Sequence, residues 1–116
     1  VASYMASCDV LLMPWNDSPW IKACNPIKLK EYLAVGRPVV STPFDELEHW
    51  KDVVEVRDDA VGFAAAITTA LEKKADSETI RDHVRAATWH VKAREVVAGL
   101  SDLGIDCEMM TPYDQE

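Results

Sequence analysis

The sequence of 116 residues predicts an α/β fold, built on a partial parallel sheet of about three strands with flanking helices. Two observations predict this class. Short, continuous apolar runs bounded by turn residues are typical of strands buried in a parallel sheet. Segments with helical periodicity alternate with these runs, as crossover connections between parallel strands require. The composition agrees, because 48% hydrophobic and 28% charged residues is the balance of a globular domain.

The first elements along the chain are a helix end, a strand and a loop. Val1–Cys8 has apolar residues at helical spacing. Asp9–Trp15 (DVLLMPW) is an apolar run containing a proline near its end, and it predicts a first strand buried on both faces. Asn16–Cys24 carries turn residues and is expected to be a loop.

A helix is expected from Pro26 to about Val35. Asn25 suits the N-cap, because its side-chain oxygen can accept a hydrogen bond from a free N–H of the first turn. Pro26 suits the first helical position, where a missing N–H costs little, and Gly36 is a usual residue just after a helix end. The apolar stripe of this helix is predicted to consist of Leu29, Tyr32 and Leu33.

The rest of the chain supplies two strands and three longer helices. The strands are expected at Pro38–Thr42 (PVVST) and Asp52–Val56 (DVVEV), with a short helix or turn at Phe44–Lys51 between them. Asp58 is predicted to cap a helix from Asp59 to about Lys74, with Phe63, Ile67, Ala70 and Leu71 facing inward. Further helices are expected from Ser77 to about Thr88 and from Trp89 to Leu103, followed by an irregular tail at Gly104–Glu116.

Charge and cysteine content exclude several classes of function. A net charge of −8 disfavours nucleic acids and anionic membranes, although a local basic cluster can still bind a small anion. The cysteines, Cys8, Cys24 and Cys107, are odd in number and form no C-x-x-C pair, which argues against a disulfide framework or a zinc site. We therefore expect no metal and no cofactor, and a reducing, cytoplasmic location, with any membrane association arising through a longer parent protein.

The residues best suited to chemistry lie between Cys24 and Thr42 (CNPIKLKEYLAVGRPVVST). A helix N-terminus attracts phosphate through free N–H groups and the helix dipole, and Lys28 adds a positive charge there. Glu31 follows three residues later on the same face, where a carboxylate can accept hydrogen bonds from ribose hydroxyls. The plain alternative is an ordinary surface pair of a lysine and a glutamate beside a capped helix.

The run N-P-x-K-x-x-E-Y-x-A-x-G-x-P-V-V-S-T at Asn25–Thr42 resembles the nucleotide-sugar signature of GT-B glycosyltransferases of the group 1 type. The resemblance extends over roughly residues 1–103, through the preceding DVLLMP strand, the AAITTAL helix and Ala87-Thr88-Trp89. It implies the C-terminal half of a Rossmann-like, nucleotide-sugar-binding domain at residues 1–103, with residues 104–116 as its tail.

The resemblance also implies roles for individual residues. Glu31 matches the glutamate that binds the ribose of the nucleotide, and Lys28 matches a basic residue near the diphosphate. The loop whose backbone approaches the phosphates corresponds to Asn25, Pro26 and Ile27. Many retaining members carry a second glutamate eight positions before the first, where this chain has Ala23, so no catalytic residue is assigned.

A second candidate site follows the first predicted strand. Ligands of open α/β sheets bind beyond the carboxyl ends of the strands. Asn16, Asp17 and Trp20, with Lys22, are therefore candidates for contact with the donor sugar or the acceptor. The alternative is a solvated loop in which a tryptophan packs as a plug.

Two functions from different classes remain open on the sequence. In the first, the chain is the donor-binding part of a transferase that moves a sugar from a nucleotide diphosphate to a saccharide or lipid-linked acceptor. It would be inactive without an N-terminal domain or partner subunit. In the second, it is a non-catalytic nucleotide- or protein-binding module that completes its sheet by homodimerisation at an exposed edge, or with another chain. A receiver-type domain is disfavoured, because the acidic residues follow mainly the later strands.

Overall fold

The computed structural model describes residues 1–73 and 75–106. Its contacts divide the chain into two units, Val1–Arg85 and Ala86–Glu116. The first unit contains the sheet and all the candidate site residues. The predicted tail lies largely outside the described residues, from Cys107 onward.

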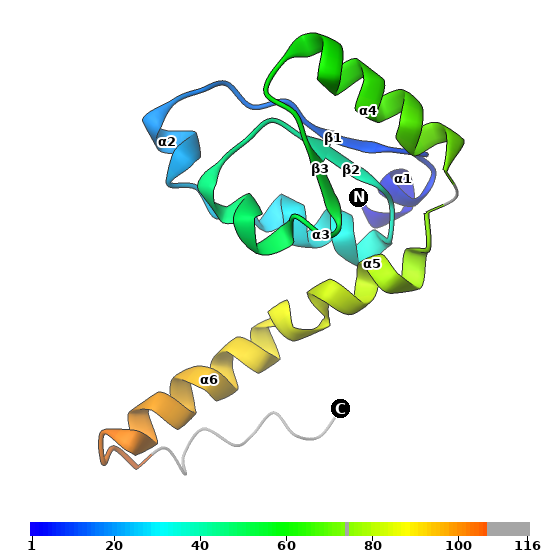
Figure 1. Cartoon of the computed structure of the whole chain (residues 1–116). Coiled ribbons are helices and arrows are strands. Elements are labelled where there is room, and N and C mark those ends of the chain that lie inside the picture. The colour runs from blue at the N-terminus through cyan, green and yellow to red at the C-terminus, as the bar shows by residue number, and fades with distance from the viewer. Residues whose placement is uncertain (74, 107–116) are drawn as a thin grey trace. The chain divides into compact units, whose positions relative to one another are not determined.

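The first unit is built on a parallel three-stranded sheet (Figure 1). Its strands are β1 (Leu11–Met13), β2 (Val39–Ser41) and β3 (Val54–Val56), in the order β1-β2-β3. Leu12 pairs with Val40, which in turn pairs with Glu55. The predicted α/β class and all three predicted strands are confirmed, although each strand is shorter than its apolar run.

Helices cover both faces of the sheet, with α4 on one side and α3 on the other (Figure 1). In chain order, the helices of the first unit are α1 (Ala2–Ala6), α2 (Pro19–Lys22), α3 (Ile27–Val35), the 3-10 helix η1 (Asp45–Trp50), α4 (Ala60–Glu72) and α5 (Ser77–Val84). The 3-10 helix η2 (Arg85–Ala87) spans the division between the units. The segment expected to be a loop after β1 therefore contains one helical turn, α2, which Ser18 caps through the Ile21 N–H at 3.3 Å.

The core lies between α3 and the sheet. Leu29, Leu33 and Val40 are fully buried, and Tyr32 is half-buried. The prediction that the first strand is buried on both faces is wrong, because Leu12 remains 40% exposed. The physical reason is that β1 is an edge strand of the sheet, while α4 packs over the central strand β2.

Two predicted helix caps are displaced by one residue. Pro26, not Asn25, is the N-cap of α3, and no side chain closes that helix end. Asp59, not Asp58, caps α4 by accepting a hydrogen bond from the Gly62 N–H at 2.8 Å. The inward face of α4 also differs, because Ala66 is its buried residue while Leu71 is exposed.

The end of α3 agrees with the sequence. Gly36 adopts a left-handed conformation with φ of 77°. A Cβ at this position would meet the Ser77 carbonyl oxygen at 2.9 Å, so α5 packs where only glycine fits. The Arg81 guanidinium donates to the Val35 carbonyl oxygen at 3.0 Å and to that of Ala34 at 3.3 Å, which satisfies the free carbonyls of the helix end.

The described part of the second unit, up to residue 106, consists mainly of α6 (Trp89–Asp102), which Thr88 caps through the Val91 N–H at 3.3 Å. None of the residues of α6 is buried, and Trp89 is exposed. The prediction of a helix reaching Thr88 is wrong, because α5 ends at Val84 and the chain continues as η2. Over the described residues, no helix is long and apolar enough to cross a bilayer.

Candidate functional site

An open cleft of about 760 Å³ lies at the carboxyl ends of all three strands. We call it the strand-end cleft. It is lined by the segments that follow β1, β2 and β3 and by η1, namely Trp15, Asn16, Asp17, Lys22, Thr42, Pro43, Phe44, Asp45, Leu47, Glu48, Lys51, Val56 and Asp58. This is where ligands of open α/β sheets bind, and the volume falls within the range of small-molecule sites.

Bonds donated by Thr42, which follows β2, hold the ends of β1 and β2 together beside the cleft. Thr42 Oγ1 donates to the Trp15 carbonyl oxygen at 2.9 Å, and the Thr42 N–H donates to the Met13 carbonyl oxygen at 3.2 Å. The buried Ser41 Oγ lies 2.8 Å from the Thr42 carbonyl oxygen. We call the two bonds that Thr42 donates the Thr42 clamp, and they join the backbone that follows β2 to the end of β1.

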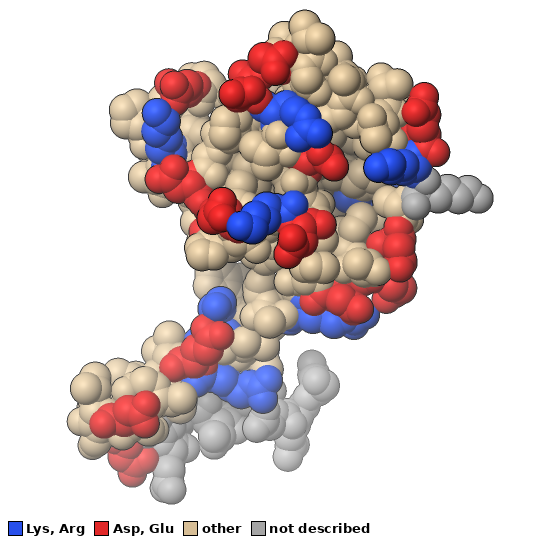
Figure 2. Space-filling view, in the orientation of Figure 1, with Lys and Arg blue, Asp and Glu red and all other residues tan. Residues whose placement is uncertain are grey.

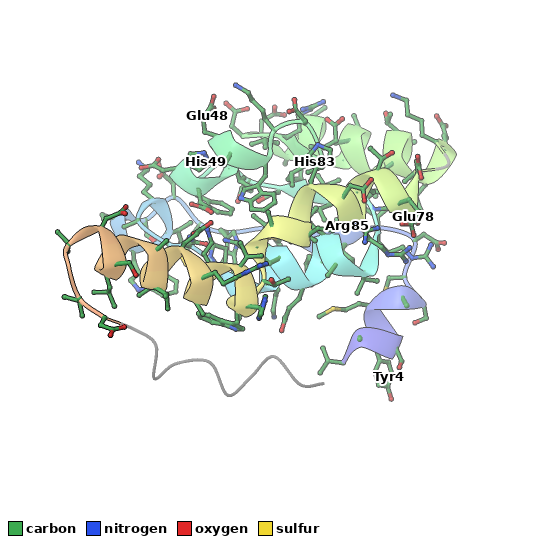
Figure 3. All side chains as sticks on the ribbon, turned by 90° about the horizontal axis from the view of Figure 1, so that it is seen from below. Tyr4, Glu48, His49, Glu78, His83 and Arg85 are labelled. Atoms are coloured by element: carbon green, nitrogen blue, oxygen red, sulfur yellow. The ribbon has the colours of Figure 1, made fainter. Side chains whose placement is uncertain are left out.

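Two ion pairs lie along the walls of the cleft. Lys22 Nζ is 2.9 Å from Asp17 Oδ1, and this hydrogen bond raises the pKa of Lys22, to which the charge of Asp45 also contributes. Lys51 Nζ is 2.6 Å from Glu48 Oε1, which raises the pKa of Lys51 and lowers the pKa of Glu48. Figure 3 shows Glu48 on η1. Both lysines are therefore already paired with carboxylates.

The remaining lining of the cleft is acidic and apolar. Asp45 and Asp58 add two carboxylates, so four acidic side chains face two lysines. Within the part of the chain that the structure describes, Asp58 makes no hydrogen bond or ion pair. Trp15, Phe44 and Leu47 supply apolar surface, of which Phe44 and Leu47 are buried.

The predicted nucleotide residues form a separate group at the start of α3. Ile27, Lys28 and Glu31 are exposed, and none of them lines the cleft. Among the described residues, Lys28 and Glu31 make no ion pair with each other. Asn25 Oδ1, rather than capping α3, accepts a hydrogen bond from Lys30 Nζ.

A contact that sequence reasoning missed connects α3 to the cleft wall. Lys30 Nζ lies 3.2 Å from Glu46 Oε1, and Trp50 Nε1 donates to the same oxygen at 3.3 Å. Lys30 also lies over the Trp50 ring, 5.6 Å from its centroid, a distance at which a cation is attracted to the ring face. No periodicity could reveal this group, because Lys30 and Glu46 are separated by 16 residues.

The structure brings residues of the second predicted site together in the cleft and leaves the predicted nucleotide residues outside it. Asn16, Asp17 and Lys22 line the cleft, as the strand-end position of their segment predicts. Trp20 does not line it and is 70% exposed on α2. Charged side chains of both signs are interspersed over the visible face, without one dominant basic patch (Figure 2). Over residues 1–73 and 75–106, no cluster of three or more His, Cys, Asp or Glu side chains is arranged to hold a metal ion.

Comparison with known proteins gives two matches. The family profile described as "Glycosyl transferases group 1" matches residues 1–73. The protein named "Putative teichuronic acid biosynthesis glycosyltransferase TuaH" of Bacillus subtilis (strain 168) is 31% identical over 105 residues. This alignment covers 84% of the present chain but 26% of the relative, so the chain spans about a quarter of that protein's length. No solved structure matches significantly.

Proposed function

Because the chain belongs to the group 1 glycosyltransferases, we propose that it is the part of a transferase domain that binds the nucleotide-diphosphate sugar donor. The observation that carries the proposal is the placement of Lys28 and Glu31. Both are exposed at the start of α3, three residues apart, so one ligand can reach both side chains. We assign the diphosphate to Lys28 and to the backbone of Asn25, Pro26 and Ile27, and the ribose to Glu31.

The electrostatics of this segment support a diphosphate. The N-terminus of α3 carries free N–H groups, and no side chain caps it. Helix N-termini of this kind bind phosphate. Lys30, the nearby second cation, is held by Glu46 and Asn25, which leaves Lys28 as the lysine of α3 that makes no ion pair with any described residue.

Transfer of the sugar to a saccharide or lipid-linked acceptor would also need a catalytic base and groups that bind the acceptor. No side chain here is assigned as the catalytic base. We therefore propose that the 116-residue chain binds the donor but does not transfer the sugar without an N-terminal domain or a partner subunit. Turnover of a nucleotide sugar by the purified chain would contradict this.

The test of donor binding is a thermal-unfolding titration of the chain with UDP, GDP and ADP. A ligand that binds only the native state adds about 2.7 kcal/mol at a hundredfold excess over Kd. We expect one nucleotide to raise the unfolding temperature, and Glu31→Ala to reduce that rise. Glu72→Ala, which removes an exposed glutamate at the end of α4, is the matched control and should leave the rise unchanged. The absence of a rise with all three nucleotides would contradict donor binding by this chain.

A second function has one observation in its favour. Leu12 is 40% exposed on β1, which pairs on one side only within the described sheet, so its other edge offers backbone groups for pairing. A non-catalytic module that homodimerises or binds a partner chain through this edge would cover it. Sedimentation of the chain tests homodimerisation: a dimer that Leu12→Lys dissociates would support it, and a monomer well above micromolar concentration would contradict it.

A further inference from the structure

We propose that Lys30 is a positioning residue of the nucleotide site: by holding the side chain of Asn25, it keeps the N-terminus of α3 uncapped and open to a diphosphate. This inference rests on the proposed function, because the diphosphate is the ligand assigned to that helix end. It adds a residue that touches no ligand and acts only through Asn25.

The ammonium group of Lys30 has a fixed place between α3 and η1. Lys30 Nζ lies 3.2 Å from Glu46 Oε1, and Trp50 Nε1 donates to the same oxygen at 3.3 Å, which orients the carboxylate. The ammonium also lies over the Trp50 ring, 5.6 Å from its centroid. Because the Lys30 side chain keeps only 20% of its surface exposed, the ammonium has lost much of its water and depends on protein acceptors.

The second acceptor of this ammonium is the side-chain oxygen of Asn25. An ammonium group carries three donors, and Glu46 and Asn25 take two of them. The bond engages the same oxygen with which an asparagine caps a helix. Asn25 directly precedes Pro26 and is the N-cap that the sequence predicts, yet no side chain of the described residues caps α3. The hold of Lys30 on Asn25 accounts for the missing cap.

A cap and a phosphate would use the same donors. The side chain of an N-cap residue accepts a hydrogen bond from the second or third N–H of the helix. With Asn25 as the cap and Pro26 as the first helical residue, these groups are the N–H of Ile27 and of Lys28. Both lie in the segment assigned to the diphosphate. A capped α3 would therefore bind a diphosphate more weakly, in proportion to the fraction of molecules that stay uncapped.

The experiment is a double-mutant cycle on the full 116-residue chain, with Lys30→Met, Asn25→Ala and the combined variant. The probes are UDP and inorganic pyrophosphate, titrated by NMR into isotope-labelled protein well below its unfolding temperature. Lys30→Met should raise the Kd of both probes about fivefold, the factor that corresponds to a typical asparagine cap. In the Asn25→Ala background, the same substitution should change either Kd by less than about twofold.

The matched control is Lys92→Met, which removes a lysine paired with a glutamate on α6 and should leave both Kd values unchanged. A purely electrostatic effect of Lys30 would weaken binding equally whether or not Asn25 is present. The cycle therefore separates the release of Asn25 from the loss of one positive charge.

A second measurement needs no ligand. In the free chain, Lys30→Met should slow the exchange of the Ile27 or Lys28 N–H with water about fivefold, because the released Asn25 side chain protects it. The combined variant with Asn25→Ala should not show this slowing. Slowed exchange in a chain that binds neither UDP nor pyrophosphate before substitution would contradict the proposed function, while the control of the cap by Lys30 would be confirmed.

Three results would overturn the inference even where UDP binds. The first is a Kd that Lys30→Met leaves unchanged. The second is an equal rise of the Kd with and without Asn25, which would mean that Lys30 acts by its charge alone. The third is unchanged exchange of the Ile27 and Lys28 N–H groups in Lys30→Met, which would show that a released Asn25 does not cap α3.

Discussion

Lys30 Nζ and Glu46 Oε1 lie 3.2 Å apart, and each of the two side chains keeps only 20% of its surface exposed. This pair joins α3, which carries the proposed nucleotide residues, to η1, which forms one wall of the strand-end cleft. Trp50 Nε1 donates to the same carboxylate oxygen at 3.3 Å, so Glu46 is the shared acceptor of the group. The two candidate sites are therefore connected by side chains that belong to neither.

The first prediction concerns this pair. Lys30→Met should lower the free energy of unfolding by about 1–2 kcal/mol, between the values typical of exposed and of fully buried pairs, because Glu46 loses its cation. A double-mutant cycle with Glu46→Gln, measured by denaturant unfolding, should give a coupling energy of about 1 kcal/mol. The exposed pair Lys92–Glu95 on α6 is the control and should give about 0.3–0.5 kcal/mol. Equal coupling in the two cycles would show that partial burial adds nothing.

The second prediction concerns the end of α3. Gly36→Ala should destabilise the chain by more than about 1 kcal/mol, because φ of 77° is unfavourable for alanine and its Cβ would lie 2.9 Å from the Ser77 carbonyl oxygen. Gly99→Ala is the matched control. Gly99 lies inside α6, with no atom within 4 Å of an added Cβ, so alanine should stabilise that helix by about 0.5–1 kcal/mol. Thermal unfolding followed by circular dichroism measures both changes, and a harmless Gly36→Ala would contradict the packing of α5 against this residue.

The third prediction distinguishes two neighbouring aspartates. Asp59→Ala should cost about 1 kcal/mol of stability, because Asp59 caps α4 through the Gly62 N–H. Asp58→Ala should change stability by less than about 0.5 kcal/mol, as expected for an exposed residue without a partner. Denaturant unfolding of the two variants compares them directly. A larger loss of stability for Asp58→Ala than for Asp59→Ala would indicate that Asp58 caps α4, as the sequence predicts.

The fourth prediction concerns acid stability. Asp76 accepts hydrogen bonds from Thr79 Oγ1 at 2.6 Å and from the Glu78 N–H at 3.1 Å, and these bonds lower the pKa of Asp76 below its ordinary value of 3.8. A carboxyl group whose pKa is lower in the folded state adds stability that is fully present above the unfolded value. This stability is lost as the pH falls through the folded value.

Asp76→Asn should therefore reduce the loss of stability that occurs below pH 3.8, because asparagine does not titrate. The measurement is the free energy of unfolding, from denaturant curves, between about pH 6 and pH 2. Curves for the variant and the parent chain that stay parallel throughout this range would contradict the role of Asp76 in acid unfolding.

The main elements could be predicted because their signals are local. Apolar runs identify the three strands, and Gly36 identifies the end of α3, since only glycine adopts its φ at no cost. The helix caps could not be predicted from the chemistry of neighbouring residues alone. Asp58 and Asp59 are chemically equal in the sequence, and the path of the chain after β3 decides which of them meets the Gly62 N–H. Asn25 was expected to cap α3, but Lys30 occupies its side-chain oxygen.

The candidate site could be predicted only in part, for a related reason. The segment after β1 was identifiable from the position of ligands at strand ends, and it supplies Asn16, Asp17 and Lys22 to the cleft. The other walls come from segments after β2 and β3, whose acidic residues carry no local sequence signal of a site. The segments after the three strands lie together in the cleft because the strands pair in parallel. No single segment shows this pairing in its sequence. The roles assigned to Lys28 and Glu31 stay predictions until a nucleotide is titrated.

The Thr42 clamp has a consequence for how this protein can diverge. Its bonds run from Thr42 to the backbone oxygens of Met13 and Trp15, so the ends of β1 and β2 are joined without any side chain of the segment between Asn16 and Cys24. Apart from the buried Ile21, that segment can change in sequence without loss of these bonds. Natural sequence variation should therefore accumulate there, while the hydroxyl at position 42 persists among variants.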